Sequence, residues 1–504
     1  MKKIFFLLFT VIIALSAFSE PPPKHEFRGA WLHIIGQSQY KYMTSQEMQL
    51  YFIYLLDSLQ SCNVNAVIFQ VRPTADAFYF SDIEPWSQYL TGTQGQAMED
   101  GFDPMEFVLE ETHKRTMEFH AWLNPYRVTA SDKDVLCNTH LYYQYPERFL
   151  KYGKQLYLDP GLKENRDHIC KVVKDIVSRY DVDAIHLDDY FYPYPIAGER
   201  FPDEDSFKKS ASAQGFSSNQ IGDWRRNNVN LLIEQIKLTI VSTKPWVRFG
   251  ISPFGIYRNK KSTPDGSGSD TNGLQNYDDL YADILLWMQK GWIDYCIPQI
   301  YWEIGHSAAD YEKLINWWSM QQSDCQIYIG QSVDNTMNAS DSQFSKSNQL
   351  PRKMQLERTL PGIHGNCWWP GYSIVSNYNG IADSLRNNYQ IYPAIIPAYT
   401  HLHKKTPKDV KSLKTEWTWN GYLLHWRRNG DPKDPEKAQY YIVYRFNNGE
   451  KTQLNDPSKI VALTKKTFIL LPYEKGQIKY KYVVTSVDRF HNETKKGKSK
   501  KVKL

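Results

Sequence analysis

Three carboxylates lie where short apolar runs end, and their types and spacing allow acid–base chemistry. Asp188 and Asp189 belong to the segment DAIHLDDYFYPYP, residues 183–195. Glu303 lies near the end of the segment DYCIPQIYWEIG, residues 294–305. Carboxyl groups in unlike surroundings can divide the work of catalysis, one staying ionised while another holds a proton.

The alternation of side chains along a strand suggests where these groups point. His186 and Asp188 share one face of the first segment, and Gln299, Tyr301 and Glu303 share one face of the second. With both polar faces turned inward, Asp188 and Glu303 oppose each other across a cleft, the arrangement that glycoside hydrolysis requires. The structural alternatives are that the two aspartates anchor a loop or cap a helix, and that Glu303 forms an ion pair with an arginine, Arg72 or Arg258.

Two divisions of roles stay open. In the first, apolar neighbours make Glu303 the general acid, and Asp188 stays ionised as nucleophile or as base for water, oriented by Asp189. In the second, the sugar carries an acetamido group and the adjacent pair serves substrate-assisted hydrolysis, one aspartate orienting the acetamido group and the other donating the proton.

Polar and aromatic residues in the same register supply stacking surfaces and hydroxyl-binding groups of the kind that sugars need. The predicted substrate-binding residues are Trp31, Gln70, Arg72, Trp122, Asn124, Tyr126, His186, Tyr190, Tyr192, Ser252, Arg258, Gln299, Tyr301, Trp302, Trp368 and Trp369. The chain has no GxSxG elbow of a serine hydrolase, and no HxxxH or HxH pair lies on a predicted barrel strand. We therefore expect neither a metal ion nor a cofactor.

The elements that must position these residues alternate regularly. Eight short runs rich in β-branched and aromatic residues are separated by segments of helical period, which predicts a (β/α)8 barrel with long loops after the strands. The weakest helix is the seventh, within residues 340–360, because Pro351 interrupts it. An open doubly wound sheet is the alternative, but the glycine-rich first turn typical of that fold is missing. The predicted strands cover residues 27–33, 66–72, 119–126, 184–190, 248–254, 295–302, 326–333 and 365–369.

The periodicity changes near the C-terminus. Short alternating strands predict a small all-β sandwich over residues 407–504, which resembles a fibronectin type III domain in its ending VTSVDRFHNET, residues 484–494. We expect residues 27–396 to form the barrel, with linkers at residues 20–26 and 397–406, and the sandwich to be dispensable for turnover.

Charge divides the chain in the same way. The net charge of the 504 residues is +5. Residues 404–504 hold 24 Lys and Arg against 10 Asp and Glu, a charge of +14, which leaves −9 for the remainder. An acidic body disfavours nucleic acid as a partner. The basic tail is either a solvated surface or a binding surface for an anionic cell-wall or surface polymer.

The first 19 residues have the pattern of a signal peptide. Lys2 and Lys3 precede the apolar run at residues 4–15, and Ala17 and Ser19 are the small residues before a cleavage site. We expect export to a periplasm or outside the cell. No run is long enough to predict a membrane span.

Seven segments together resemble the glycoside-hydrolase-like family ten of bacterial exported proteins. They are EFRGAWLH (26–33), NAVIFQVRPTADAFY (65–79), AWLNPYR (121–127), IHLDDYFYP (185–193), GISPFGIYRN (250–259), YDDLYAD (277–283) and IDYCIPQIYWE (293–303). The resemblance implies a (β/α)8 barrel and glycosidase chemistry on a polysaccharide. Some members of the family act on the glycan strands of peptidoglycan, particularly strands stripped of stem peptides. The eighth strand, GNCWWPG at residues 365–371, departs from the family pattern.

The sequence thus predicts an exported glycoside hydrolase acting on an N-acetylhexosamine-containing glycan such as peptidoglycan. The alternatives are a hydrolase of a dietary or capsular polysaccharide and a non-catalytic carbohydrate-binding scaffold.

Overall fold

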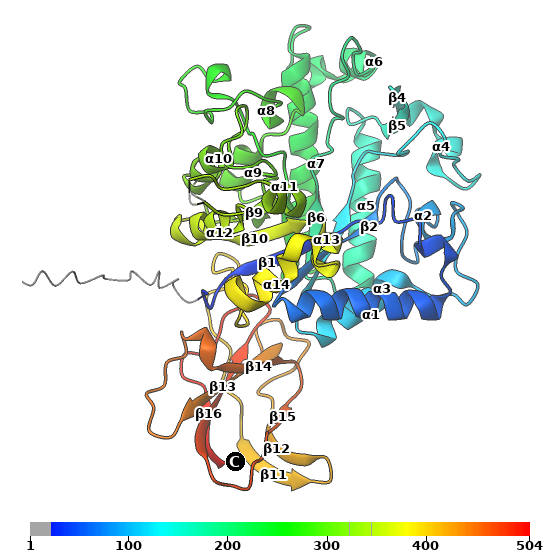
Figure 1. The fold of residues 1–504 in the computed structure, drawn as a ribbon. Coiled ribbons are helices and arrows are strands. Elements are labelled where there is room, and N and C mark those ends of the chain that lie inside the picture. Colours follow the sequence, from blue (N-terminus) through cyan, green and yellow to red (C-terminus); the bar gives the residue numbers. More distant parts are fainter. Residues whose placement is uncertain (1–21, 322, 344) are drawn as a thin grey trace, which may run out of the picture.

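The computed structural model describes residues 22–321, 323–343 and 345–504, and the predicted signal peptide lies outside them. Eight parallel strands close into a barrel in the order β1-β10-β9-β8-β7-β6-β3-β2 (Figure 1). The predicted (β/α)8 barrel is therefore confirmed. The barrel strands are β1 (Phe27–Leu32), β2 (Ala66–Arg72), β3 (Glu118–Leu123), β6 (Ala184–Leu187), β7 (Arg248–Ile251), β8 (Tyr295–Cys296), β9 (Gln326–Ser332) and β10 (Ile363–Trp369).

All eight predicted strands are present, and several end earlier than expected. β8 is the shortest, with only Tyr295 and Cys296 in regular pairing. Pro298 has no N–H to give to a ladder, so pairing beyond Cys296 is reduced to isolated bridges from Gln299 to Phe254 and Gly330. The polar end of this segment is therefore loop rather than strand.

Helices follow the strands around the outside of the barrel. Pro351 falls in the first turn of α12, where it begins the helix instead of interrupting it. The main helices are α1 (Ser45–Ser61), α3 (Pro104–Lys114), α5 (Lys163–Arg179), α7 (Ile221–Thr243), α9 (Ile284–Gln289), α10 (Tyr311–Ser319) and α12 (Leu350–Thr359). Shorter ones are α2 (Gln88–Thr91), α4 (Leu141–Gln144), α6 (Glu204–Ser210), α8 (Asn276–Asp279), α11 (Val333–Asn338), α13 (Gly371–Val375) and α14 (Ile381–Ser384).

The core has two layers, as the alternation of strand side chains requires. Outward-facing residues pack against the helices in one large cluster. Inward-facing aromatic residues fill the barrel, among them Phe27, which stacks on Tyr328 with ring centroids 3.9 Å apart. The barrel interior is thus a packed core, and only its ends can accept a ligand.

The C-terminal residues form two antiparallel sheets, with strand orders β11-β12-β15 and β14-β13-β16-β17. Apolar residues from both sheets share one core, so the sheets make a small sandwich. Its likeness to fibronectin type III domains remains a prediction. The strands are β11 (Leu413–Thr418), β12 (Gly421–Trp426), β13 (Tyr440–Asn447), β14 (Ile460–Thr464), β15 (Phe468–Leu470), β16 (Lys479–Val487) and β17 (Lys498–Lys503). A small hairpin, β4 (Phe149–Tyr152) and β5 (Gln155–Leu158), belongs to the loop after β3.

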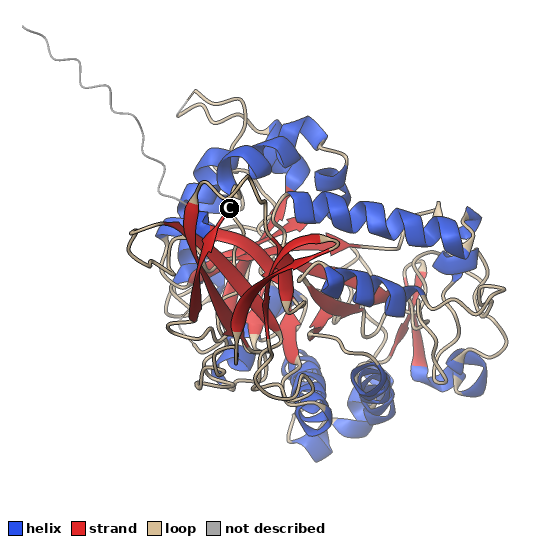
Figure 2. Cartoon of the chain, turned by 90° about the horizontal axis from the view of Figure 1, so that it is seen from below, coloured by secondary structure: helices blue, strands red, loops and turns tan. Residues whose placement is uncertain are grey.

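The sandwich lies against the end of the barrel where the strands begin (Figures 1 and 2). Glu118, the first residue of β3, contacts His491 at 2.6 Å, and Asp181, just before β6, contacts Arg489 at 2.6 Å. The long loops after the strands lie at the opposite end, where barrel enzymes place their active sites. The sandwich therefore leaves that end uncovered.

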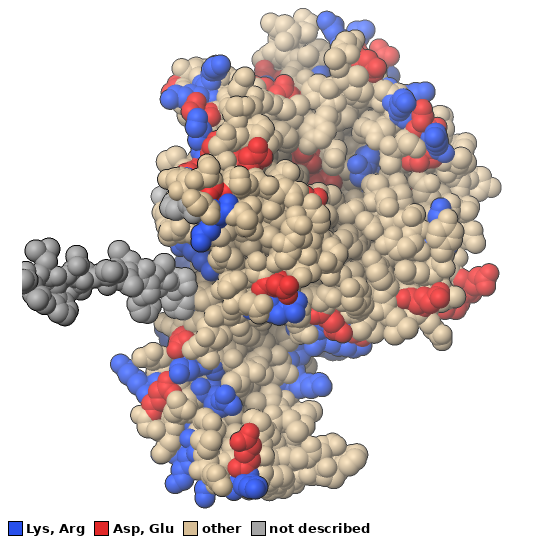
Figure 3. Space-filling model, in the orientation of Figure 1, with Lys and Arg blue, Asp and Glu red and all other residues tan. Residues whose placement is uncertain are grey.

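On the face seen in Figure 3, basic side chains are spread over the sandwich together with several acidic ones. Within the described residues, no helix combines the length and apolar character that crossing a membrane would require.

Candidate active site

The adjacent pair Asp188 and Asp189 lies immediately after β6. Regular pairing of β6 ends at Leu187, beside Leu123 of β3 and Ile251 of β7. Strict alternation of side chains does not hold beyond the strand, so neighbouring residues can reach one polar cluster. Both aspartates are only 3% exposed.

Asp188 is held by two donors from the neighbouring strand. The Trp122 indole N–H donates to one carboxylate oxygen at 3.1 Å, and the Asn124 amide donates to the other at 3.4 Å. The Tyr190 backbone N–H donates to that second oxygen, also at 3.4 Å. These donors fix the orientation of the carboxyl group at the carboxyl end of the barrel.

Asp189 has a separate set of donors. The Tyr194 hydroxyl donates to one of its oxygens, and the Gln299 amide is a second donor. The same Gln299 amide donates to the Ser252 carbonyl oxygen at 2.8 Å. The polar face of the 294–305 segment thus reaches the aspartate pair through Gln299.

Burial governs the protonation of this pair. Loss of solvation, followed by the charge of Asp189, raises the pKa of Asp188 to about 7, although Arg127 and Trp122 act in the opposite direction. Burial also raises the pKa of Asp189, against the lowering by Tyr194 and Gln299. The sequence led us to expect an ionised Asp188; the structure instead makes it a group that is protonated about half the time near pH 7.

Aromatic rings border the pair. Trp122 meets Trp369 edge to face at 6.1 Å, and Trp31 meets Tyr301 edge to face at 6.5 Å. Both aspartate charges and Tyr190 raise the already elevated pKa of the buried Tyr301, which places its hydroxyl near the pair. These rings give the site apolar walls of the kind on which sugar faces stack.

Several predicted substrate-binding residues have other partners. The Gln70 side chain accepts from the backbone N–H groups of Ile34 and Ile35, which fixes the start of a loop. Arg72 is fully buried and forms an ion pair with Glu84, and its guanidinium also donates to the Asn124 carbonyl oxygen. Arg72 therefore positions Asn124 from behind.

Arg258 and Trp302 also have partners other than Asp188 and Asp189. Arg258 is bound by Asp278, with nitrogen–oxygen distances of 2.8 and 3.0 Å. Trp302 packs against Phe254 with ring centroids 5.3 Å apart.

Three predicted aromatic residues face the outer layer of the core. Trp368 belongs to the cluster between strands and helices, whereas its neighbour Trp369 packs with the inner cluster, because adjacent strand residues face opposite sides. Tyr192 packs edge to face on Phe201 and Tyr281, and Tyr126 is buried in the outer cluster as well.

Glu303 has different surroundings from the pair. Burial lowers the pKa of the Lys353 ammonium to about 7, and Glu357 and Glu303 partly oppose that lowering. This places the Glu303 carboxylate near Lys353 of α12. The contacts of Asp188 among the described residues are with Trp122, Asn124 and Tyr190, and Glu303 is not one of them.

Two contributors to the site were absent from the sequence prediction. Tyr194 binds Asp189 from five residues along the same loop. Arg127, whose guanidinium lies over the Tyr190 ring at 4.9 Å, lowers the pKa of both aspartates. Arg127 closes the motif AWLNPYR and Tyr194 lies in the tyrosine-rich loop 190–194, but neither motif shows which partner its residue meets.

Among the residues that the structure describes, no three His, Cys, Asp or Glu side chains gather in a way that could hold a metal ion. The site is built from carboxylates, amide groups and aromatic rings.

The model of the family Glycosyl hydrolase-like 10 matches residues 26–346, well over half of the chain, and this range includes Asp188, Asp189 and their hydrogen-bond donors. The chain belongs to this family. Its membership, and the named relatives below, identify it as an enzyme of the glycoside hydrolase class.

Relatives cover both the barrel and the whole chain. Glycosyl hydrolase YngK of Bacillus subtilis (strain 168) is 40% identical over 97% of this chain and 96% of its own length. Glycosyl hydrolase DigH of Escherichia coli (strain K12) is 38% identical over 62% of this chain and 75% of its own length. Among solved structures, the PgaB (BpsB) glycoside hydrolase domain from Bordetella bronchiseptica covers 72% of this chain and 98% of that domain, with a TM-score of 0.45 and 12% identity.

The raised pKa of Asp188 predicts a pH-dependent stability difference. Folded protein keeps the Asp188 proton up to about pH 7, whereas the unfolded chain loses it near pH 4, so this group stabilises the fold at low pH and loses that effect as pH rises through about 7. Asp188→Asn is never charged. Relative to the wild type, it should therefore gain on the order of 2–4 kcal/mol in free energy of unfolding between pH 4 and pH 8.

Denaturant titrations at several pH values measure this difference. Asp167→Asn is the matched control, because the pKa of Asp167 is lowered and its carboxylate stays ionised between pH 5 and pH 8. Its difference from the wild type should stay nearly constant between pH 5 and pH 8. A similarly constant difference for Asp188→Asn would contradict the raised pKa.

Proposed function

We propose that this chain is an exported glycoside hydrolase that cleaves O-glycosidic bonds in an N-acetylhexosamine-containing glycan such as peptidoglycan strands. The observation that carries the proposal is the buried adjacent pair Asp188 and Asp189, with separate donors and an acid of raised pKa. Family membership supports the reaction class. The signal-peptide pattern of residues 1–19 supports export.

The geometry favours the adjacent-pair mechanism over a cross-barrel pair. Asp188 holds a proton near neutral pH and can give it to the leaving glycosidic oxygen. Asp189, held by Tyr194 and Gln299, is placed to accept a hydrogen bond from an acetamido N–H. Glu303 interacts with Lys353, which supports leaving it out of the proposed reaction.

Hydrolysis by this pair needs only the substrate, the two aspartates and water. The acetamido oxygen of the substrate attacks the anomeric carbon while the bond to the leaving oxygen breaks and that oxygen takes the Asp188 proton. A cyclic intermediate forms on the sugar itself, with Asp189 accepting from its N–H. Water then attacks the anomeric carbon while the bond from that carbon to the acetamido oxygen breaks, and the attacking water gives a proton to Asp188, which restores the acid and releases the sugar with retained configuration.

Two alternative functions would give different results when the protein is incubated with glycans. A hydrolase of dietary or capsular polysaccharide would use the same aromatic walls on a sugar without the acetamido group. A carbohydrate-binding scaffold would need the walls, but it has no use for two buried carboxyl groups, which are costly to keep out of water.

Digestion of purified peptidoglycan, intact and stripped of stem peptides by an amidase, tests substrate and mechanism together. We expect the wild type to release new reducing ends, and Asp188→Asn and Asp189→Asn each to lower kcat by about 100-fold or more, since each removes a proton-transfer or orienting role. Glu303→Gln should stay within about threefold of the wild type. Products are measured by chromatography and mass spectrometry.

Inactivity of the wild type on both substrates, with turnover of a polysaccharide lacking acetamido groups, would overturn the substrate class. Binding without any product on a broad panel would favour the scaffold. An inactive Glu303→Gln beside an active Asp189→Asn would restore the cross-barrel pair.

The sandwich carries lysines whose spacing favours an anionic partner. In the pairing of β16 with β17, Lys479 lies opposite Lys503, and Lys481 lies opposite Lys501. Like charges directly opposite each other destabilise a sheet, and an anionic polymer lying along these strands would relieve that repulsion. We therefore extend the proposal to binding of an anionic cell-wall or surface polymer by the sandwich.

Co-sedimentation of the full chain with cell-wall sacculi at increasing salt tests this binding. Replacing Lys479, Lys501 and Lys503 by Gln should weaken it at least several-fold and reduce its salt dependence. The matched control replaces the exposed barrel residues Lys260, Lys261 and Lys290, with the same change in charge. Equal binding by the two triple variants would show that position on the sandwich is irrelevant.

A further inference from the structure

A continuous chain of hydrogen bonds runs through the barrel interior, beneath the aspartate pair. His186 lies on β6, two residues before Asp188, and pairs with Trp122 of β3, whose indole donates to Asp188. Its Nδ1 is 3.1 Å from the Tyr295 hydroxyl, which is 2.8 Å from Nδ1 of His120. Nε2 of His120 is 2.9 Å from the Glu118 carboxylate. These four side chains connect the two ends of the barrel.

The direction of every hydrogen in this chain follows from its ends. At the upper end, Nε2 of His186 is 3.3 Å from the Trp31 indole nitrogen, which can only donate. Burial holds the pKa of His186 well below its usual range, so the ring is neutral and its hydrogen must be on Nδ1. His186 therefore donates to the Tyr295 oxygen.

The lower end gives the same direction independently. Buried Arg248 and His491 keep the pKa of Glu118 well below its usual range, so this carboxylate can only accept. His120 must then carry its hydrogen on Nε2, and its Nδ1 accepts from the Tyr295 hydroxyl. The Tyr295 hydroxyl therefore accepts from His186 and donates to His120, which joins the two histidines in a consistent order.

The fold makes room for this hydroxyl at a specific point. A Cβ on Gly250 would lie 1.9 Å from the Tyr295 ring, so only glycine fits at this position of β7. Two residues further on, just after β7 ends, the Ser252 hydroxyl is 3.0 Å from Nε2 of His186, and the Ser252 carbonyl oxygen accepts from Gln299. Gln299 in turn donates to Asp189. The chain therefore reaches the proposed catalytic pair.

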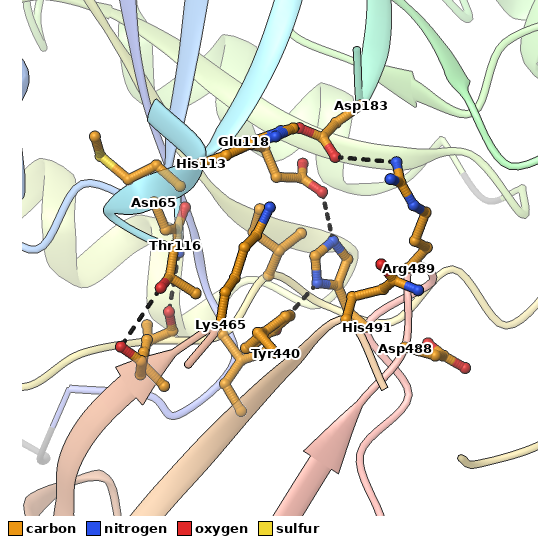
Figure 4. Close-up of a pocket in the computed structure, with 16 residues that line it drawn as sticks. Asn65, His113, Thr116, Glu118, Asp183, Tyr440, Lys465, Asp488, Arg489 and His491 are labelled. Carbon is orange, nitrogen blue, oxygen red and sulfur yellow. Dashed lines mark hydrogen bonds and ion pairs between the residues drawn. The ribbon is translucent and has the colours of Figure 1, made fainter. Parts of the chain in front are cut away.

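Its lower end belongs to the C-terminal sandwich. Nε2 of His491 donates to Glu118 at 2.6 Å, and Nδ1 of His491 is 3.2 Å from the Tyr440 hydroxyl of β13 (Figure 4). Arg248, which also binds Glu118, lies 3.0 Å from the same imidazole. The other charged groups facing this hollow between barrel and sandwich are His113, Asp183, Lys465, Asp488 and Arg489.

We propose that Tyr295, His120 and His186 are positioning residues of the active site and that His491 anchors them from the sandwich. Docking of the sandwich thereby sets the geometry of Gln299 and Asp189. The sandwich, which the sequence led us to regard as dispensable for turnover, is on this account part of the catalytic unit. The proposal rests on the assignment of Asp188 and Asp189 as the catalytic pair.

Tyr295→Phe removes the joining hydroxyl and keeps the ring. We expect kcat to fall about 10-fold or more, with KM within twofold of the wild type. The high-pH limb of kcat/KM should move by half a pH unit or more, because a displaced Asp189 changes the effect of its charge on the pKa of Asp188. The matched control is Tyr328→Phe. Tyr328 is equally buried in the same inner cluster, and among the described residues its hydroxyl bonds Gln326 and Tyr399, both at 2.6 Å, and neither histidine of the chain. Equal kcat and pH profiles for the two variants would overturn the proposal.

The contribution of the sandwich is tested with His491 in the full chain. His491→Leu removes the donor to Glu118 and should lower kcat several-fold, whereas His491→Gln keeps an amide N–H near the Nε2 position and should restore most of it. Arg489→Gln is the control, because it breaks an ion pair with Asp181 at the same interface without touching Glu118. A fall in kcat as large for Arg489→Gln as for His491→Leu would show that docking in general, and not this chain, matters.

Nitrogen-15 spectra of the histidines test the chain without any turnover. Wild-type His186 should show its hydrogen on Nδ1 and His120 on Nε2, and both signals should shift in Tyr295→Phe. A hydrogen on Nε2 of His186 would refute the chain itself. If the wild type shows these tautomers and cleaves no glycan, the proposed function fails while the chain stands.

Discussion

Two neighbouring carboxyl groups kept out of water at the end of β6 are the constraint on which the rest of the site depends. Neither group can ionise freely, since burial disfavours each charge and the charge of Asp189 further disfavours that of Asp188. The hydrogen-bond donors around the two carboxyl groups differ. Asp189 receives a hydroxyl and an amide close to its oxygens, while Asp188 keeps the higher tendency to hold a proton.

Other side chains inside the barrel support this difference between Asp188 and Asp189. Trp122 reaches Asp188 from β3, and the same strand places His120 and Glu118 below it at every second residue. Because the interior is close-packed with aromatic rings, a hydrogen-bonded chain can be held there in one direction. His120 and Glu118, which lie below Asp188, therefore act on the site through other side chains.

Much of this arrangement could be predicted from the sequence. The alternation of apolar runs predicted the number and place of the barrel strands, and period two along β6 predicted that His186 points into the barrel, where it contacts Tyr295. The prediction of side-chain directions was less accurate at the ends of strands. Pro298 ends regular pairing of β8, so extending its alternation to Glu303 had no structural basis.

Contacts between distant segments were the other limit. No local pattern predicts that Arg72 pairs with Glu84 or that Tyr194 donates to Asp189. The same holds for the contact of His491 with Glu118, which are 373 positions apart. Residue types at strand ends identify candidates for a site. Their partners depend on how loops close over the barrel, and that is decided by packing throughout the fold.

The protonation of Asp188 is the most direct test of the account. Carbon-13 labelling of the aspartate carboxyl groups, with Asp188→Asn to assign the signal, would follow its titration by magnetic resonance in the intact chain. We expect a midpoint near pH 7, moving down when Asp189 is replaced by Asn, because its charge is removed. A midpoint near pH 4 that is indifferent to Asp189 would contradict the account of the pair as a buried acid and its partner.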